Sequence, residues 1–142
     1  MIRKAQMRDL DAYYELICQL ENQRFDKERF KEIYKRQLDD PSYSLSVYEI
    51  NDEVCAIMTL QFYERLHHNG LTCELVELIT NVSHRNEGIG EKLLQEAIGQ
   101  AQQRSCLEIE LSSSMWRTDA HRFYERHGFK KNHYNFILSL KQ

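Results

Sequence analysis

The chain has 142 residues, of which 42% are hydrophobic and 29% charged, and this composition suits one globular domain with a single core. Its formal net charge of -3 argues against a nucleic-acid-binding domain, which needs a concentrated basic surface. No apolar run approaches membrane-span length, and residues 1–10 lack the apolar core of a signal peptide. We therefore expect one domain over residues 1–142 that acts on small molecules, with no nucleic acid and no membrane as partner.

The four cysteines, Cys18, Cys55, Cys73 and Cys106, are far apart in the chain and fit no metal-ligand spacing. Each lies within an apolar run, where a reduced thiol packs as a small hydrophobic group. We expect buried thiols in a reducing compartment, and so a cytoplasmic protein without a metal site.

The first 41 residues predict a short strand followed by two helices. Residues 2–5 suit a strand, and apolar side chains recur at helical spacing from Leu10 to Leu20. Asp26 can cap a second helix, and Pro41 prevents that helix from continuing beyond Asp40.

The middle of the chain predicts three strands. Residues 43–47 alternate apolar side chains with serines, Asn51-Asp52 marks a turn, and residues 54–63 form a longer apolar strand. These two strands predict an antiparallel hairpin. Residues 72–80 predict the next strand, which carries two acidic side chains.

The last third predicts a helix, a strand, a helix and a final strand. The helices cover residues 89–104 and 118–127, with Gly128 as a C-terminal cap, and the strands cover residues 107–111 and 134–140. A strand-helix-strand unit of this kind joins neighbouring parallel strands. The expected order βααβββαβαβ is a mixed α/β fold whose central, mostly antiparallel sheet is flanked by helices.

The segment Arg85-Asn86-Glu87-Gly88-Ile89-Gly90 lies between a predicted strand and a predicted helix. Backbone N–H groups and the dipole at a helix N-terminus attract phosphate, and glycines let the backbone approach it closely. A dinucleotide fingerprint needs a third glycine and a P-loop needs Gly-Lys before Ser or Thr, and neither occurs. A loop that only turns the chain is the remaining alternative.

This segment resembles the signature of the GCN5-related N-acetyltransferase (GNAT) family, which is Arg or Gln, two residues, Gly, one residue, then Gly or Ala. That family also begins strand-helix-helix and ends with a helix bearing Ala-x-x-Phe-Tyr before Gly-Phe. The matching residues here are Ala120, Phe123, Tyr124, Gly128 and Phe129.

Within the family the chain is similar to aminoalkylphosphonate N-acetyltransferases, and the resemblance covers nearly the whole chain. It implies direct attack by the primary amine of a small molecule on acetyl-CoA, with both substrates bound together. A homodimer is an expectation of the same kind. The shared patterns are residues 16–20, Phe25-Asp26, Leu66-His67-His68, Glu74-x-x-Glu77-Leu78 and residues 119–124.

The resemblance also implies which residues bind the cofactor. Backbone groups beside the end of the acidic strand contact the acetyl-pantetheine arm, and the loop before the helix holds the pyrophosphate. The residues concerned are Thr80, Asn81, Val82, Arg85, Asn86, Glu87, Gly88, Ile89 and Gly90.

Acetyl transfer requires a base for the ammonium and an acid for the departing thiolate. The resemblance assigns Glu74 first and Glu77 second as base, and Tyr124 as acid. In a regular strand the two glutamates point to opposite faces, although a bulge, common in this strand of the family, would alter that. The alternatives are solvated strand carboxylates and a core tyrosine, or a non-catalytic CoA-binding sensor of the same fold.

Overall fold

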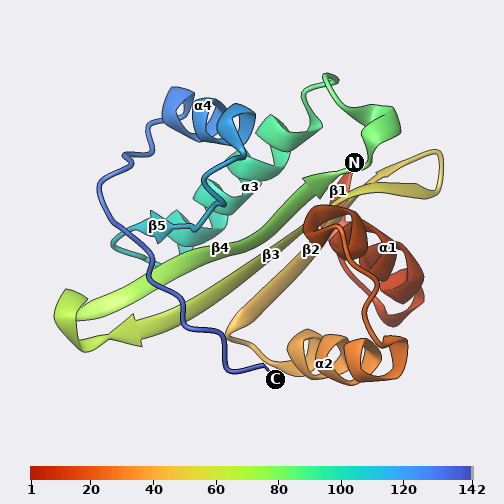
Figure 1. The fold of residues 1–142 in the computed structure, drawn as a ribbon, viewed down its shortest axis with the longest axis horizontal. Helices are drawn as coiled ribbons and strands as arrows, with labels where there is room; N and C mark the ends of the chain where they lie inside the picture. Colours follow the sequence, from red (N-terminus) through yellow and green to blue (C-terminus); the bar gives the residue numbers. More distant parts are fainter. Residues whose placement is uncertain (142) are drawn as a thin grey trace. The chain divides into compact units, whose positions relative to one another are not determined.

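The computed structural model describes residues 1–141 and divides the chain into two units, Met1–Glu110 and Leu111–Gln142. Among the described residues, the first unit holds every strand and three α-helices, and the second holds one α-helix (Figure 1). The mixed α/β class expected from the sequence is confirmed.

The sheet of the first unit is mostly antiparallel, as expected. Each strand pairs antiparallel with the next, except that the last two are parallel. At the β-hairpin turn, Asn51 and Asp52 have φ angles of 50° and 64°, which asparagine and aspartate tolerate better than most residues. In spatial order the strands are β1 (Ile2–Lys4), β2 (Tyr43–Ile50), β3 (Glu53–Arg65), β4 (Gly70–Thr80) and β5 (Ile109–Glu110).

Helices cover both faces of this sheet (Figure 1). One face carries α1 (Leu10–Glu21) and α2 (Lys27–Asp39), and the other carries α3 (Ile89–Gln103). Asp26 caps α2 as predicted, because its carboxylate accepts the Arg29 N–H at 3.0 Å. The core under α1 and α2 consists of Ala5, Tyr13, Leu16, Tyr34, Leu45, Val47, Ile57 and Ile79.

The strand-helix-strand unit is also confirmed, since β4 and β5 are parallel and α3 connects them. The second strand is shorter than the expected residues 107–111, because regular pairing with β4 covers Ile109 and Glu110. Leu107 and Glu108 still form backbone hydrogen bonds with Leu71 and Cys73 of β4.

The second unit contains α4 (Thr118–Arg126), close to the predicted helix. Gly128 has a φ of 94° and follows the helix end, where the N–H groups of Gly128 and Phe129 donate to carbonyls of the last turn. This is the expected glycine cap.

Residues 134–140 do not form the predicted final strand, and that prediction is wrong for the described structure. The segment has no regular secondary structure, and its alternating side chains Tyr134, Phe136, Leu138 and Leu140 are 84% to 92% exposed. An alternating pattern becomes a strand only where a neighbouring strand supplies backbone partners. Among the described strands, none pairs with this segment.

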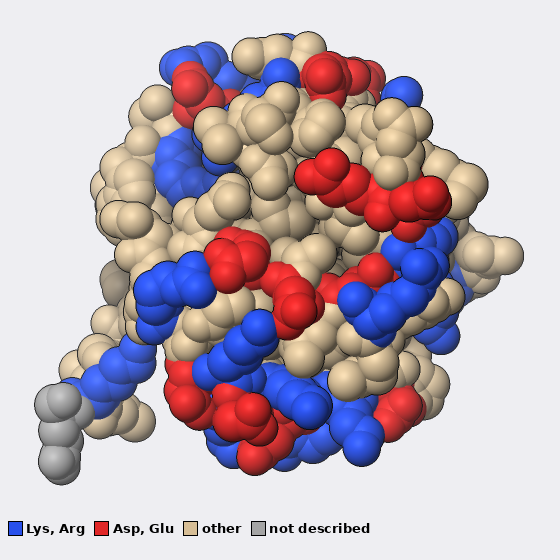
Figure 2. Space-filling view, turned by 90° about the vertical axis from the view of Figure 1, so that its right-hand side faces the viewer, with Lys and Arg blue, Asp and Glu red and all other residues tan. Residues whose placement is uncertain are grey.

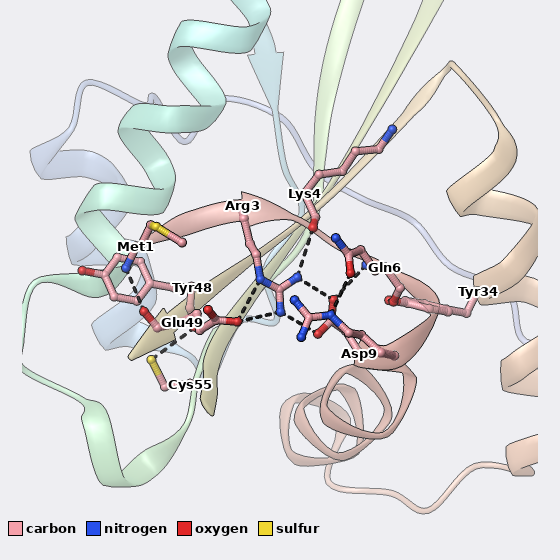
Figure 3. A network of polar contacts seen from close by, with 10 residues as sticks. Met1, Arg3, Lys4, Gln6, Asp9, Tyr34, Tyr48, Glu49 and Cys55 are labelled. Atoms are coloured by element: carbon pink, nitrogen blue, oxygen red, sulfur yellow. Dashed lines mark hydrogen bonds and ion pairs between the residues drawn. The ribbon is translucent and has the colours of Figure 1, made fainter. Parts of the chain in front are cut away.

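A buried ion-pair network fastens the start of the chain to the sheet (Figure 3). Arg3 on β1 donates two hydrogen bonds of 2.8 Å to Asp9, and a third of 2.8 Å to Glu49 on β2. Asp9 is only 4% exposed and also accepts the Gln6 N–H at 2.8 Å. Burial alone would raise the pKa of Asp9, but the hydrogen bonds from Arg3 and Gln6, with the guanidinium charge, hold it below its usual value.

Replacing Arg3 with methionine should lower the free energy of unfolding at neutral pH by about 3 to 5 kcal/mol, because Asp9 is left buried without its cation. The lowered pKa stabilises the protein above the unfolded value near 3.9, and this stabilisation is lost as pH falls through the folded value. The defect should therefore shrink in acid. Urea unfolding at pH 7 and at pH 2 measures it.

The exposed neighbour Lys4 provides the control, because Lys4→Met removes a cation from the same strand without touching Asp9. Equal losses in both variants would contradict a specific role for the Arg3 network.

Candidate active site

A β-bulge in β4 decides where the two candidate glutamates lie. Thr59 on β3 pairs with Glu77, but the next residue, Leu60, pairs with Leu75, so Val76 is an extra residue on β4. Side chains three residues apart in a regular strand point to opposite faces of the sheet, and the extra residue between Glu74 and Glu77 reverses this. Glu74 and Glu77 therefore share the sheet face that α1 covers.

This placement follows from the pairing of each glutamate across the strands. Glu77 lies opposite Thr59, whose hydroxyl meets the Tyr13 hydroxyl of α1. Glu74 lies opposite Gln61, two residues further along β3 and so on the same face.

Glu77 is a partly buried carboxyl group. Burial raises its pKa above the usual value, and the nearby charges of Glu21 and Glu74 raise it further, while a hydrogen bond from Thr59 opposes these effects. A carboxylate with a raised pKa is a stronger base than an ordinary surface glutamate.

Glu74 has different partners. Its carboxylate accepts a hydrogen bond of 3.2 Å from Tyr63 and lies 3.9 Å from Arg65. The same hydroxyl lies 3.1 Å from a Glu110 carboxylate oxygen, so Glu74 and Glu110 share its one hydrogen. Arg65 pairs with Glu110, and its guanidinium carbon lies 4.3 Å from the centre of the Tyr63 ring. This cluster of Tyr63, Arg65, Glu74 and Glu110 holds Glu74 in an ion-pair network. Sequence reasoning missed the other three members, because only the strand register brings them together.

The loop before α3 has the backbone shape that an anion site needs. Gly88 is the N-cap of α3 and has a φ of 78°, and Asn86 has a φ of 68°. Gly88 has no side chain with which to cap this helix end, and a β-carbon built on it has no atom within 4 Å. The first N–H groups of a helix have no partner inside the helix and favour a negative ligand.

Most of the other predicted cofactor residues lie between the end of β4 and this loop. Asn81 follows β4 and caps the short 3-10 helix η3 (Val82–His84), accepting the Ser83 N–H at 3.2 Å. The Arg85 Nε lies 3.5 Å from the Thr80 carbonyl oxygen. Glu87 pairs with His84 at 3.0 Å, which engages its carboxylate with a neighbouring side chain.

Tyr124 lies on α4 in the second unit. Its ring contacts Phe123 and Phe129, with centroid distances of 5.2 and 5.6 Å. Burial raises the pKa of its phenol, and the charge of Arg117 opposes this effect only in part. The side chain therefore stays protonated through the neutral range and can serve as a proton donor.

The histidines of the β3–β4 connection form contacts with their neighbours. The rings of His67 and His68 lie 4.4 Å apart, and His68 pairs with Glu108 at 3.2 Å. The described residues contain no group of three or more side chains suited to a metal ion. The described part of the chain also contains no helix with the length and apolarity to cross a membrane. Figure 2 shows acidic and basic side chains mixed over one face, without a broad basic field.

Comparison with known proteins identifies a matching family. The model of the acetyltransferase (GNAT) family matches residues 10–129. An aminoalkylphosphonate N-acetyltransferase from Salmonella typhimurium (strain LT2) is 34% identical over 139 residues, which cover 98% of this chain and 90% of that protein.

Solved structures share the fold. A transcriptional regulator from Bacillus halodurans C-125 superposes with a TM-score of 0.91 at 26% identity, covering 99% of both chains. Glucosamine-6-phosphate N-acetyltransferase from Arabidopsis thaliana superposes with a TM-score of 0.84 at 17% identity, covering 99% of this chain and 98% of that one.

Proposed function

Because the chain belongs to the acetyltransferase (GNAT) family and is an N-acetyltransferase, we propose that it transfers the acetyl group of acetyl-CoA to the amine of a small aminoalkylphosphonate. The acceptor class rests on the 34% identical relative, whose match extends over almost the whole chain. The family match spans the boundary between the two units, which supports one catalytic domain over residues 1–142.

The observation that carries the proposed mechanism is Glu77 on the bulged strand, with a raised pKa and a hydroxyl partner. Glu77 removes a proton from the substrate ammonium, and the resulting amine attacks the thioester carbonyl carbon. A C–N bond forms, the C–S bond breaks, and the thiolate takes the Tyr124 proton. The attacking nitrogen loses its second proton to solvent as the amide forms, and the Tyr124 phenolate regains a proton from solvent. Glu74 is bound by Tyr63 and Arg65, and it helps to hold these side chains in place on the sheet instead of acting as the base.

The cofactor contacts proposed from the family resemblance are consistent with the loop geometry. Residues 85–90 would hold the pyrophosphate at the N-terminus of α3, because Gly88 leaves open space beside the first helical N–H groups. Backbone groups of Thr80, Asn81 and Val82 would contact the acetyl-pantetheine arm. Dimer formation belongs to the same proposal.

Acetyl-CoA should raise the melting temperature of the protein, because it binds only the folded state. Gly88→Ala should abolish most of that rise. An alanine at a φ of 78° is strained, and its methyl group enters the space left open at the helix end. Thermal unfolding with and without acetyl-CoA measures this effect.

Gly99 is the matched control, because it lies inside α3, where an added β-carbon also meets no atom within 4 Å. Gly99→Ala should keep the full acetyl-CoA effect. An undiminished effect in Gly88→Ala would refute the proposed position of the pyrophosphate.

Glu77→Gln should lower the rate of acetyl transfer to 2-aminoethylphosphonate at neutral pH by about 10²-fold to 10⁴-fold. An aliphatic ammonium with a pKa near 10 is almost fully protonated at neutral pH, so raising the pH supplies free amine and should restore part of the rate. Thiol release measured from pH 6.5 to 9.5 tests this.

Glu74→Gln serves as the control and should show a smaller defect that pH does not repair. A pH-dependent defect in Glu74→Gln alone would make Glu74 the base, in the order first expected from the sequence. Acetyl-CoA binding without thiol release for any amine, including diamines and amino acids, would instead indicate a non-catalytic module.

Tyr124→Phe should lower turnover about 10²-fold while leaving acetyl-CoA binding nearly unchanged, since it removes one proton donor and keeps the ring that contacts Phe123 and Phe129. Steady-state kinetics and calorimetric binding separate the two effects. Turnover equal to that of the parent would leave Tyr124 with a packing role only.

A further inference from the structure

Four oxygen-bearing groups form a continuous row beneath α1. The Tyr13 hydroxyl lies 2.8 Å from the Met58 carbonyl oxygen and 2.8 Å from the Thr59 hydroxyl. Glu77 lies directly opposite Thr59 in the strand register, where the Thr59 hydroxyl acts as a hydrogen-bond donor that lowers the pKa of the carboxyl group. Tyr13 and Thr59 are only 2% and 1% exposed, so bulk water does not reach this part of the row.

The hydrogens available to this row depend on the state of Glu77. The row contains three contacts, but Tyr13 and Thr59 supply only one hydroxyl hydrogen each. With Glu77 ionised, Thr59 donates to the carboxylate, Tyr13 donates to the Met58 carbonyl, and the Tyr13–Thr59 contact lacks a hydrogen. With Glu77 protonated, the carboxyl donates to Thr59, Thr59 donates to Tyr13, and Tyr13 donates to Met58. Every contact is then satisfied.

The other charged groups near Glu77 also favour its protonated form. Glu21 on α1 and Glu74 on β4 place negative charge near it. Tyr43 on β2 and the buried Tyr13 and Tyr34 remain neutral, because burial raises the pKa of each phenol. These groups place no positive charge against Glu77, so the hydroxyl row provides its specific hydrogen-bonding environment.

We propose that Tyr13 and Thr59 are positioning residues that hold Glu77 and control its proton uptake, because the Thr59 hydroxyl hydrogen turns from the Glu77 carboxylate to the Tyr13 oxygen when Glu77 is protonated. The inference rests on the proposed role of Glu77 as base. When Glu77 takes the ammonium proton, the row gains its missing hydrogen, and this favours proton transfer from the substrate. The proton then leaves Glu77 for solvent, and the Thr59 hydroxyl turns back to the carboxylate.

Two variants should move the titration of Glu77 in opposite directions. Tyr13→Phe removes the Tyr13–Thr59 contact, which only the protonated state of Glu77 satisfies. The midpoint of the Glu77 titration should therefore fall by about half to one pH unit. Thr59→Val removes the donor that stabilises the carboxylate, so the midpoint should rise. Carbon-13 NMR of glutamate-labelled protein reads this midpoint directly, without substrate.

Two further variants separate positioning from general damage to the core. Thr59→Ser keeps the hydroxyl and should restore the parent midpoint. Tyr34→Phe removes another buried hydroxyl, which donates to the Gln6 carbonyl at 2.7 Å, and should leave Glu77 unmoved. If Thr59→Val does not fold, the comparison of Tyr13→Phe with Tyr34→Phe still tests the proposal.

The fall of kcat/KM at low pH, its acid limb, is measured in the same variants. It distinguishes the positioning role of Tyr13 and Thr59 from the role of Glu77 as base. Opposite shifts in both the NMR midpoint and the acid limb would support the row and the base together. NMR shifts without any movement of the acid limb would keep the row and refute Glu77 as base. An NMR midpoint unchanged in Tyr13→Phe, or moved equally by Tyr34→Phe, would overturn the positioning role.

Discussion

The extra residue Val76 in β4 is the constraint on which the candidate site depends. Without a register shift between Thr59 and Leu60, Glu74 and Glu77 would occupy opposite faces of the sheet. With the shift, both carboxylates lie on the same face of the sheet, and Glu77 lies opposite Thr59, whose hydroxyl contacts Tyr13 of α1. The segment after β4 contains η3 and the loop that begins α3. The same strand therefore carries both glutamates and leads to the proposed pyrophosphate site.

Two carboxylates of the first unit show how hydrogen-bonding and charged neighbours set the pKa of a carboxyl group, and with it the role that the group can play. Asp9 meets a guanidinium and a backbone N–H, and its pKa is lowered. Glu77 meets a hydroxyl and two like charges, and its pKa is raised. The ion pair stabilises the ionised form and suits a structural role, whereas a carboxylate without a cation has the proton affinity that a base needs.

Local patterns predicted most of the fold. The Asp26 cap, the Asn51-Asp52 turn and the Gly128 cap depend on neighbouring residues alone, and each is found where expected. The strand over residues 134–140 fails because pairing depends on a distant partner. The GNAT signature identified the family, but the bulge, the Tyr63 cluster and the Tyr13–Thr59 contact depend on register between strands, which periodicity does not encode.

The acid limb of kcat/KM reports a group of the free enzyme, and in the proposed mechanism that group is Glu77. The most direct test measures this limb for 2-aminoethylphosphonate in the unmodified protein, together with the Glu77 midpoint from carboxyl carbon-13 NMR. We expect the two midpoints to coincide and to lie above the value of an ordinary glutamate. A Glu77 midpoint that lies apart from the acid limb would contradict its role as the base.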